Sequence, residues 1–313
     1  MAIDKKFVDQ FAIVTSKAAL ASSYLVGKKD KIAADKAAVD AMRSDLNNLD
    51  IQGQIVIGEG ELDKAPMLYI GEKLGSNKGP EFDIAVDPLE GTNFVANNLP
   101  GALSVITIAE KNNLFKAPET YMEKISSRVN ESGVIDLDFT IKKNINNLSD
   151  YLNKNPENLT ACILDRPRHK ETIEELIKLK VNLKLITDGD VSGALLVTED
   201  KYNVDIFLGI GGGPEGVLAA ATLDAYNCNF QGRFLFETDE DKSRASDMGI
   251  TDLKRKYDLN EIVSGDSIFC ATGITSGDLV QGIKIEDNKF TSETFVTHKS
   301  SGLKKVIKLK QNI

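Results

Sequence analysis

Apolar residues near the start of the chain recur with the spacing of a helix. In KIAADKAAVDAMRSDLNNLD, one stripe repeats at intervals of three and four residues, namely Ile32, Asp35, Val39, Met42 and Leu46. This period predicts a helix that buries one face. Asp35 falls on that face, where an unpaired carboxylate is costly. Two interpretations stay open for Asp35: a functional acid, or an acid that the dipole favours near the start of a helix.

A strand and then a helix are predicted next. QIVIGEGELDKAP alternates apolar residues at Ile55 and Ile57, and the same alternation would carry Glu59 and Glu61 to one side of the strand. Pro66 suits the first turn of a helix through MLYIGEKLG.

FDIAVDPLEGTNF predicts a buried strand that breaks at Pro88. One face of this strand is apolar and the other carries acids, with Phe82, Ile84 and Val86 on the first and Asp83, Ala85 and Asp87 on the second. At about 3.3 Å per residue, Asp83 lies roughly 13 Å from Asp87. That is too far for the two carboxylates to share one ion, so we expect Asp83 to be a structural acid.

The second half of the chain repeats a simpler pattern. Its short apolar runs, each followed by a polar or glycine loop, are LTACILD, NLKLIT, VDIFLGI and DSIFCATG. Helical segments mostly follow, which predicts βα units around a largely parallel sheet with ligand groups beyond the carboxyl ends of its strands. The tail FTSETFVTHKSSGLKKVIKLK alternates like a closing hairpin. A further strand is predicted at GVIDLDFTI, and we expect two α/β domains, residues 1–157 and 158–313.

Composition restricts the class of protein. The 313 residues are 42% hydrophobic, and the net charge of −9 argues against nucleic acid or an anionic membrane as the main partner. Cys162, Cys228 and Cys270 lie far apart, which favours free thiols in a reducing compartment. Only two histidines are present, so a zinc site built from histidine is not expected. No apolar run is long enough for a membrane span or signal peptide, so we expect a cytoplasmic enzyme.

DPLEGT combines groups that suit a metal and a phosphate. A turn at Pro88 could bring Asp87 and Glu90 to one side, and carboxylate oxygens are ligands that Mg²⁺ and Mn²⁺ prefer. Gly91 and Thr92 could open a helix whose free N–H groups face an anion. An incidental surface turn is the alternative, and Asp35 and Glu59 make that alternative weaker.

Motifs along nearly the whole chain resemble one family. DPLEGTNF is similar to the DP-(I/L)-(D/E)-G-(S/T) signature of metal-dependent sugar and inositol phosphatases. IVIGEGELDKAPMLYIGEKLG, APETYMEK, DRPRH, DGDVSGAL, GIGGGPEGVLAAA and ATGITSGDLVQGI, with the helix described above, resemble the class II fructose-1,6-bisphosphatases. The resemblance implies a layered α-β-α-β-α sandwich of the sugar phosphatase type, with the site between two α/β domains.

The resemblance also implies roles for individual residues. The chain would remove the 1-phosphate of fructose 1,6-bisphosphate with Mn²⁺ or Mg²⁺, one ion held by Asp35 and Glu59 and another by Asp87, Glu90 and Glu215. Thr92 matches the hydroxyl that prepares the attacking group, and Asp35 and Glu59 are expected to assist catalysis. The matching substrate-binding set is Glu90, Gly91, Thr92, Tyr121, Arg166, Pro167, Arg168, Asp188, Gly189, Asp190 and Gly212.

The residue types support the substrate contacts unevenly. Arg166 and Arg168 follow a strand, and guanidinium groups match the geometry of phosphate. Asp188 and Asp190 could accept hydrogen bonds from sugar hydroxyls, although DGD is also an ordinary turn. A lone tyrosine such as Tyr121 is more often a packing residue. His169 ranks below the two arginines as a substrate contact.

Three other functions are alternatives to this one. GGGPEG satisfies G-x-G-x-x-G between a strand and a helix, the context of a dinucleotide site. Pro214 would remove an N–H group there and Glu215 would repel the pyrophosphate. A non-catalytic sugar phosphate module is a second rival, which the five acids oppose. Sedoheptulose 1,7-bisphosphate, with the same terminal phosphates, is an alternative substrate that the motifs do not separate. We expect a homodimer or homotetramer.

Overall fold

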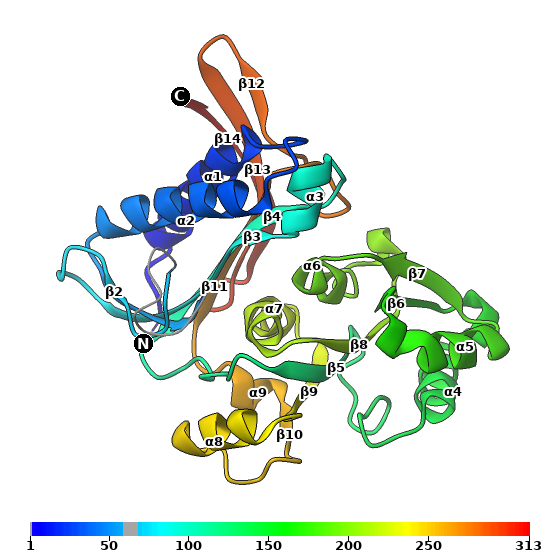
Figure 1. Cartoon of the computed structure of the whole chain (residues 1–313). Coiled ribbons are helices and arrows are strands. Elements are labelled where there is room, and N and C mark those ends of the chain that lie inside the picture. Colours follow the sequence, from blue (N-terminus) through cyan, green and yellow to red (C-terminus); the bar gives the residue numbers. More distant parts are fainter. Residues whose placement is uncertain (1, 59–67) are drawn as a thin grey trace. The chain divides into compact units, whose positions relative to one another are not determined.

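The computed structural model describes residues 2–58 and 68–313, which divide into two compact units (Figure 1). Unit 1 comprises Met1–Phe115 and Val263–Ile313, and unit 2 is the intervening Lys116–Ile262. The chain leaves and re-enters unit 1 at neighbouring points, because Leu114 forms a bridge with Val263. The expected boundary at residues 157 and 158 therefore lies inside unit 2, and unit 1 is built from both ends of the chain.

Unit 1 is a mixed sheet with helices on one face. Its strands follow the order β12-β13-β11-β4-β3-β1-β2, with β14 added to β13, and only the β1–β3 pair is parallel among the described strands. The elements are α1 Lys6–Ser23, α2 Lys31–Asn47, β1 Gln52–Ile57, β2 Lys73–Leu74, β3 Glu81–Glu90, α3 Thr92–Asn97, β4 Leu103–Glu110, β11 Ser267–Gly273, β12 Lys284–Glu286, β13 Lys289–His298 and β14 Leu303–Asn312.

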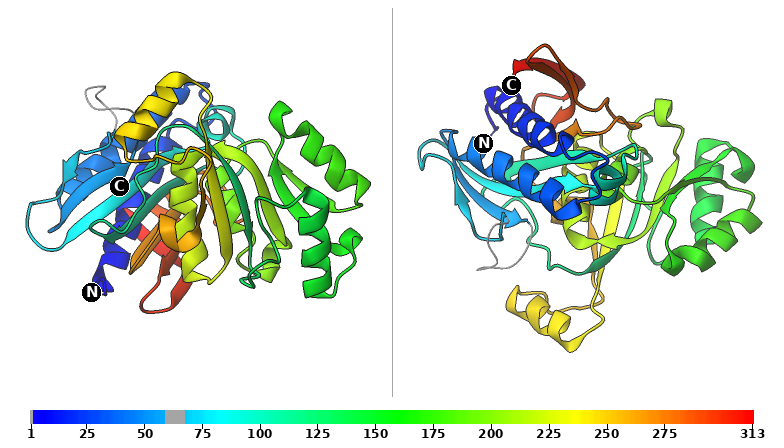
Figure 2. Two further views of the ribbon diagram at one scale, coloured as in Figure 1. Left: turned by 90° about the horizontal axis from the view of Figure 1, so that it is seen from below. Right: turned by 45° about the horizontal axis from the view of Figure 1, so that its top comes forward.

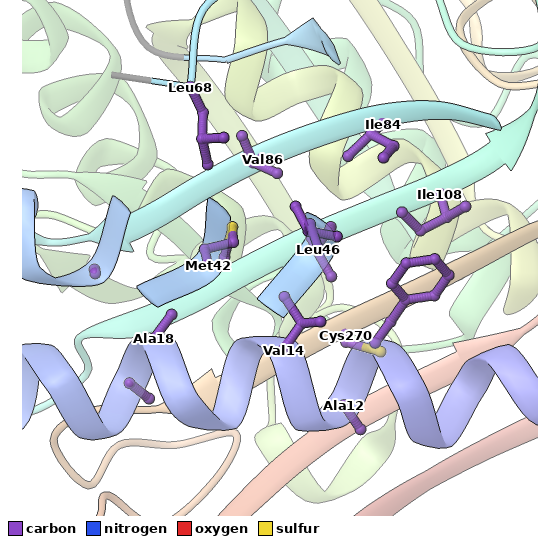
Figure 3. Packing of buried hydrophobic residues seen from close by; sticks show 14 of the residues in the cluster. Ala12, Val14, Ala18, Met42, Leu46, Leu68, Ile84, Val86, Ile108 and Cys270 are labelled. Atoms are coloured by element: carbon purple, nitrogen blue, oxygen red, sulfur yellow. The ribbon is translucent and has the colours of Figure 1, made fainter. Parts of the chain in front are cut away.

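The core of unit 1 lies between the sheet and the pair α1 and α2, which lie together in both sets of views (Figures 1 and 2). Side chains from α1, α2, β3 and β4 meet there, as Figure 3 shows for Val14, Met42, Ile84 and Ile108. The predicted helix is confirmed as α2, whose first turn is capped by Asp30 accepting a hydrogen bond from the Ala33 N–H at 2.9 Å.

Several sequence expectations in unit 1 are confirmed. Phe82, Ile84 and Val86 of β3 all lie in the core. Asp83 is buried on the other face, where its carboxylate accepts hydrogen bonds from the N–H groups of Asn113 and Leu114 at 3.0 and 3.3 Å. It is therefore a structural acid, as predicted. The tail forms the expected antiparallel hairpin of β13 and β14.

Other expectations are wrong, two of them because strand pairing outweighs a local signal. Ile32 is exposed, so the buried stripe of α2 begins at Ala34 and Ala38, and it continues through the predicted Val39, Met42 and Leu46. Residues 68–75 form a turn and the short β2 rather than a helix, since β2 pairs with β1. The segment DSIFCATG, which looked like a strand of the second domain, is β11 and pairs with β4 in unit 1.

Unit 2 has helices on both faces of its sheet. The strand order is β10-β9-β5-β8-β6-β7, and only the neighbouring pairs β6–β7 and β6–β8 are parallel among the described strands of this unit, so the expectation of a largely parallel sheet is wrong. The elements are β5 Tyr121–Ser127, α4 Ile141–Leu152, η1 Pro156–Asn158, β6 Thr160–Leu164, η2 Pro167–His169, α5 Lys170–Lys178, β7 Asn182–Ile186, α6 Asp190–Leu195, η3 Asp200–Tyr202, β8 Ile206–Gly212, α7 Gly213–Ala225, β9 Asn229–Leu235, α8 Asp239–Asp247, β10 Lys256–Asp258 and α9 Leu259–Ile262.

The two faces of this sheet are distinguished by their contacts. Ile125, Ile206 and Leu208 point into a core shared with α4 and α5, which lie side by side in Figure 2. On the opposite face, Met122 lies against Gly216 of α7. The predicted strand GVIDLDFTI is absent, and residues 133–140 form turns that lead into α4. Each unit therefore combines a sheet with helices, which confirms the α/β class.

None of the described helices is both long and apolar enough to cross a bilayer.

Candidate functional site

An irregularity in β3 brings Asp87 and Glu90 to the same face of the unit 1 sheet. Asp87 lies opposite Val105 of β4, and Glu90 lies opposite Leu103, so three steps along β3 match two along β4. Directly opposed residues in a sheet point to the same side, and residues two apart share a side. This bulge therefore aligns two acids that regular alternation would place on opposite faces. The predicted break at Pro88 is wrong, because the strand continues through this residue to Glu90.

These two carboxylates lie away from the hydrophobic core. Val86 and Leu89 point into the core with α1 and α2, so Asp87 and Glu90 face the other side of the sheet. Glu90 is buried, whereas Asp87 is partly exposed. A buried carboxylate needs a strong partner to offset its desolvation. Two hard oxygen donors on one face suit a divalent cation of the Mg²⁺ or Mn²⁺ type, so this pair fits the metal that the sequence implies.

Gly91 and Thr92 follow these acids and begin α3. Gly91 has a left-handed backbone, with φ of 82°, and a Cβ there would come within 2.7 Å of the Phe94 ring. Glycine is therefore required both by conformation and by space. Gly91 is the N-cap and no side chain caps this helix, so Thr92 is the first helical residue. A threonine at the start of a helix often caps it, but the Thr92 hydroxyl is not used as a cap here.

The remaining unit 1 candidates lie on neighbouring elements. Asp35 is partly buried in α2, which packs against β3 and α3. Glu59 lies outside the described residues. The strand that leads to it, β1, runs parallel to β3 and ends with Ile57 opposite Ala85, two residues before Asp87.

In unit 2, the predicted substrate residues and the predicted metal ligand Glu215 gather at one edge of the sheet. They follow the carboxyl ends of the parallel strands β6, β7 and β8, or stand at the start of the antiparallel β5, which lies beside β8. The carboxyl ends of parallel strands meet at one edge, and an antiparallel neighbour begins there. The residues assembled in this way are Tyr121, Arg166, Pro167, Arg168, Asp188, Gly189, Asp190, Gly212 and Glu215.

The two arginines are held differently. The guanidinium carbon of Arg168 lies 4.9 Å from the centre of the Tyr121 ring, and its Nε donates a hydrogen bond to the Ile210 carbonyl at 2.9 Å. Tyr121 therefore supports Arg168 through a cation–π contact. Arg166 lies 3.9 Å from the Asp188 carboxylate, a loose ion pair that leaves its guanidinium partly exposed. Both cations remain available to an anion at this edge.

His169 is not available to a substrate, which corrects its ranking as a possible contact. Its imidazole is buried, with Nδ1 2.7 Å from the Leu164 carbonyl and Nε2 accepting a hydrogen bond from the Ile210 N–H at 2.7 Å. These partners require the proton on Nδ1 and a neutral ring. Burial, the largest effect, lowers the pKa of His169. The residue ties the end of β6 to β8 and thereby positions Arg168, its neighbour.

Two glycines at the end of β8 leave room for acids. A Cβ on Gly211 would collide with the carboxylate of Asp190, and a Cβ on Gly212 would collide with that of Glu215. The glycine run thus accommodates carboxylates, whereas a dinucleotide loop would present N–H groups to a pyrophosphate. Burial raises the pKa of Glu215; the Lys124 ammonium opposes this effect, and Asp190 adds to it.

Lys124 is a charged residue that sequence reasoning missed. It lies in β5, fully buried, and its ammonium group pairs with the Asp190 carboxylate and donates a hydrogen bond to the Gly212 carbonyl at 2.6 Å. The sequence feature that could have identified it is a lysine within YMEKISS, the segment that forms β5. Because that strand was not predicted, the burial of the lysine was not expected either.

Within residues 2–58 and 68–313, no group of three or more histidine, cysteine or acidic side chains is arranged to hold a metal. The three cysteines are buried and form no disulfide with one another. The acids of the predicted metal set are divided between the units, and Glu59 belongs to the residues that the structure does not describe.

Comparisons with known proteins agree with the sequence motifs. Residues 5–311 match the family described as "Bacterial fructose-1,6-bisphosphatase, glpX-encoded". The Escherichia coli "Fructose-1,6-bisphosphatase 1 class 2" is 42% identical over 301 residues, which cover 92% of this chain and 89% of that protein. The Synechococcus elongatus "D-fructose 1,6-bisphosphatase class 2/sedoheptulose 1,7-bisphosphatase" is 40% identical over 296 residues, covering 87% and 86% of the two chains.

A solved structure of inositol monophosphatase from Anabaena aligns over 69% of this chain and 80% of that one, with 14% identity and a TM-score of 0.33. The family match extends over nearly the whole chain and includes the segments that carry Asp87, Thr92, Arg168 and Glu215. The chain belongs to the class II fructose-1,6-bisphosphatase family of sugar phosphate hydrolases.

Proposed function

We propose that this chain hydrolyses the 1-phosphate of fructose 1,6-bisphosphate to fructose 6-phosphate and phosphate, with Mn²⁺ or Mg²⁺ as cofactor. The observation that carries the proposal is the bulge in β3, which puts Asp87 and Glu90 on one face directly before Thr92. These are the positions that the family signature pairs with metal and with the attacking group. Cytoplasmic location, a gluconeogenic role and a homodimer or homotetramer belong to the same proposal.

The proposed metal ligands are Asp35, Glu59, Asp87, Glu90 and Glu215. A bound divalent cation would polarise the phosphoryl oxygens and lower the pKa of a water molecule. The Thr92 hydroxyl, which no capping interaction occupies, orients the attacking water, and a nearby carboxylate accepts the proton. No cysteine or serine nucleophile is needed.

Unit 2 supplies the proposed contacts to the sugar and to the phosphate that is kept. Arg168, supported by Tyr121 and Ile210, and the more loosely paired Arg166 bind the distal phosphate through charge-assisted hydrogen bonds. Asp188 and Asp190 accept hydrogen bonds from sugar hydroxyls. Gly189 and Gly212 let the backbone approach the substrate closely.

A dual activity on sedoheptulose 1,7-bisphosphate is a second candidate. It is favoured by the Synechococcus elongatus relative, 40% identical to this chain, whose name includes both bisphosphatase activities. The two substrates share their terminal phosphates, so the contacts proposed above serve both.

The experiment measures the phosphate and the sugar monophosphate that the purified chain releases from each bisphosphate, a hexose phosphate from the first and a heptose phosphate from the second. The protein is first dialysed extensively against a chelator and then assayed with Mn²⁺, with Mg²⁺ and with neither. We expect turnover of fructose 1,6-bisphosphate only with added metal. Full turnover in excess chelator would contradict the metal role, and no turnover with either ion would contradict the function.

A further inference from the structure

The buried ion pair of Lys124 and Asp190 lies at the centre of the unit 2 candidate residues. Lys124 comes from the middle of the sheet, on β5, and Asp190 is the first residue of α6. Their side chains are 1% and 9% exposed. Desolvating a lysine ammonium costs several kcal/mol, so such a residue persists only with strong partners. The pair is therefore a specific feature of this edge of the sheet.

The route of the lysine side chain is set by the glycine at position 216. Lys124 and Met122 point to the same face of β5, toward α7, and a Cβ on Gly216 would come within 3.3 Å of the Lys124 Cδ. The stem therefore passes beneath the first turn of α7. At its end, the ammonium group reaches the Asp190 carboxylate and the Gly212 carbonyl, which accepts its hydrogen bond at 2.6 Å. One cation thus joins β5, the end of β8 and the start of α6.

Only one oxygen of Asp190 is used in this pair. Oδ2 accepts from Lys124, while Oδ1 is buried and has no hydrogen-bond partner among the described residues. A buried, ionised oxygen without a donor is costly, and such groups in native proteins usually have a function. With Oδ2 held, the orientation of Oδ1 is fixed by the geometry of the carboxylate. Asp190 is therefore prepared to accept one hydrogen bond.

We propose that Lys124 is a positioning residue: it holds Asp190 so that the free oxygen of this acid accepts a hydroxyl of the sugar. This inference rests on the proposed function, because it assigns that hydroxyl to the sugar bisphosphate. Lys124 does not touch the phosphate that is cleaved. Loss of Lys124 therefore weakens the binding of the sugar more than it slows the chemical step.

The test compares Lys124→Met with wild type at saturating metal, since Lys124 also faces the Glu215 carboxylate. We expect KM for fructose 1,6-bisphosphate to rise about 10- to 100-fold, the scale of one lost hydrogen bond to a charged group, and kcat to fall less. The inhibition constant of inorganic phosphate, which has no sugar hydroxyl, should stay within about twofold. An unchanged KM, or an equal loss of phosphate binding, would overturn the proposal.

The double variant Lys124→Met with Asp190→Asn separates positioning from stability. Lys124→Met leaves a buried charge unpaired and should lower Tm, whereas the double variant removes both charges and should recover much of it. KM should remain raised in the double variant. If KM returned to the wild-type value together with Tm, the pair would be merely structural. Where Lys124→Met does not fold, the double variant alone provides the KM and phosphate comparison.

Lys256→Met is the matched control. Lys256 is also a lysine of unit 2 paired with carboxylates, those of Asp136 and Asp138, but it contacts none of the proposed site residues. The Lys256→Met variant should have a lower Tm than wild type and an unchanged KM. A wild-type chain that hydrolyses neither bisphosphate would refute the proposed function itself, whereas normal wild-type turnover with an unchanged Lys124→Met would refute only the positioning role.

Discussion

Single residues at this site have roles that their chemistry alone leaves open. Thr92 could be a helix cap or a catalytic hydroxyl, and the structure excludes the first because Gly91 occupies the N-cap position. His169 could contact a substrate or hold the fold together, and both of its ring nitrogens are used inside unit 2. In each case, the neighbouring backbone decides which function remains possible.

Replacement of Thr92 by valine tests the remaining role. Valine keeps the size and β-branching and removes only the hydroxyl, so we expect turnover to fall about 10²- to 10⁴-fold, the scale of losing one proton-handling group. The Tm should change little, because no capping hydrogen bond is lost. Turnover and thermal melting of the same preparation check this. A less stable enzyme with near-normal turnover would refute the catalytic role.

Asp87→Asn is the comparison variant for Thr92→Val. It removes a proposed ligand charge and leaves the hydroxyl in place, so the concentration of Mn²⁺ that gives half-maximal rate should rise. Excess metal should partly restore the rate of Asp87→Asn and have no effect on that of Thr92→Val. If both variants responded equally to metal, the two residues would not have separate roles.

His169 predicts a dependence of stability on pH. Its pKa in the folded protein is lowered, chiefly by burial, so the unfolded chain binds more protons between that value and about 6.5. The contribution of neutral His169 is therefore complete above about pH 6.5 and decreases as the pH falls below it. The Tm of His169→Gln should fall less steeply than that of wild type between pH 7 and 5. Parallel curves would contradict the prediction.

At the scale of elements, short irregular connections place the chemical groups. The bulge in β3 orients Asp87 and Glu90, and the left-handed Gly91 joins that strand to α3. In unit 2, the ends of β6, β7 and β8 bring side chains from separate loops to one edge. The regular elements provide the frame, and the residues immediately beyond them carry the groups proposed for binding and catalysis.

Gly91→Ala tests the connection between β3 and α3. A left-handed backbone costs a non-glycine residue roughly 1–2 kcal/mol, and the contact with Phe94 adds to this cost. We expect a larger loss of unfolding free energy than for the control Gly133→Ala, which has φ of 81° and no atom near the new Cβ. Urea unfolding measures both. Equal losses would mean that the Phe94 ring moves aside at no cost.

Gly133→Ala should also keep normal turnover, whereas Gly91→Ala should lower kcat because Thr92 is displaced. A Gly91→Ala enzyme with normal kcat would show that the conformation of this turn does not position the hydroxyl.

The whole molecule consists of a continuous unit inserted into a discontinuous one. Unit 2 contains its own core around α4 and α5, and its two ends join unit 1 next to the bridge between Leu114 and Val263. An inserted unit with neighbouring ends is expected to fold independently. Unit 1, by contrast, needs the carboxyl-terminal strands to complete its sheet.

We therefore predict that residues 116–262 fold alone. The isolated segment should give cooperative urea unfolding and a native-like circular dichroism spectrum, and it should have no phosphatase activity because Asp87, Glu90 and Thr92 are missing. The complementary construction, Phe115 joined to Val263 by a short Gly/Ser linker, should fold as well. Unit 2 unfolding without cooperativity would contradict its independence.

The sequence by itself determined the features that depend on local pattern. The alternation of Phe82, Ile84 and Val86, the period of α2 and the terminal hairpin were read correctly because burial repeats every two or every 3.6 residues. The family followed from DPLEGT and its companion motifs for a similar reason, since these are continuous segments.

Tertiary structure alone decided the features that depend on distant partners. Asp87 and Glu90 share a face, as the motif predicts, but through a bulge of β3 against β4 instead of a turn at Pro88. Lys124 is buried because it pairs with Asp190, 66 residues away, and β11 joins unit 1 because it pairs with β4. These contacts depend on which strands become neighbours, and no local period in the chain encodes that choice.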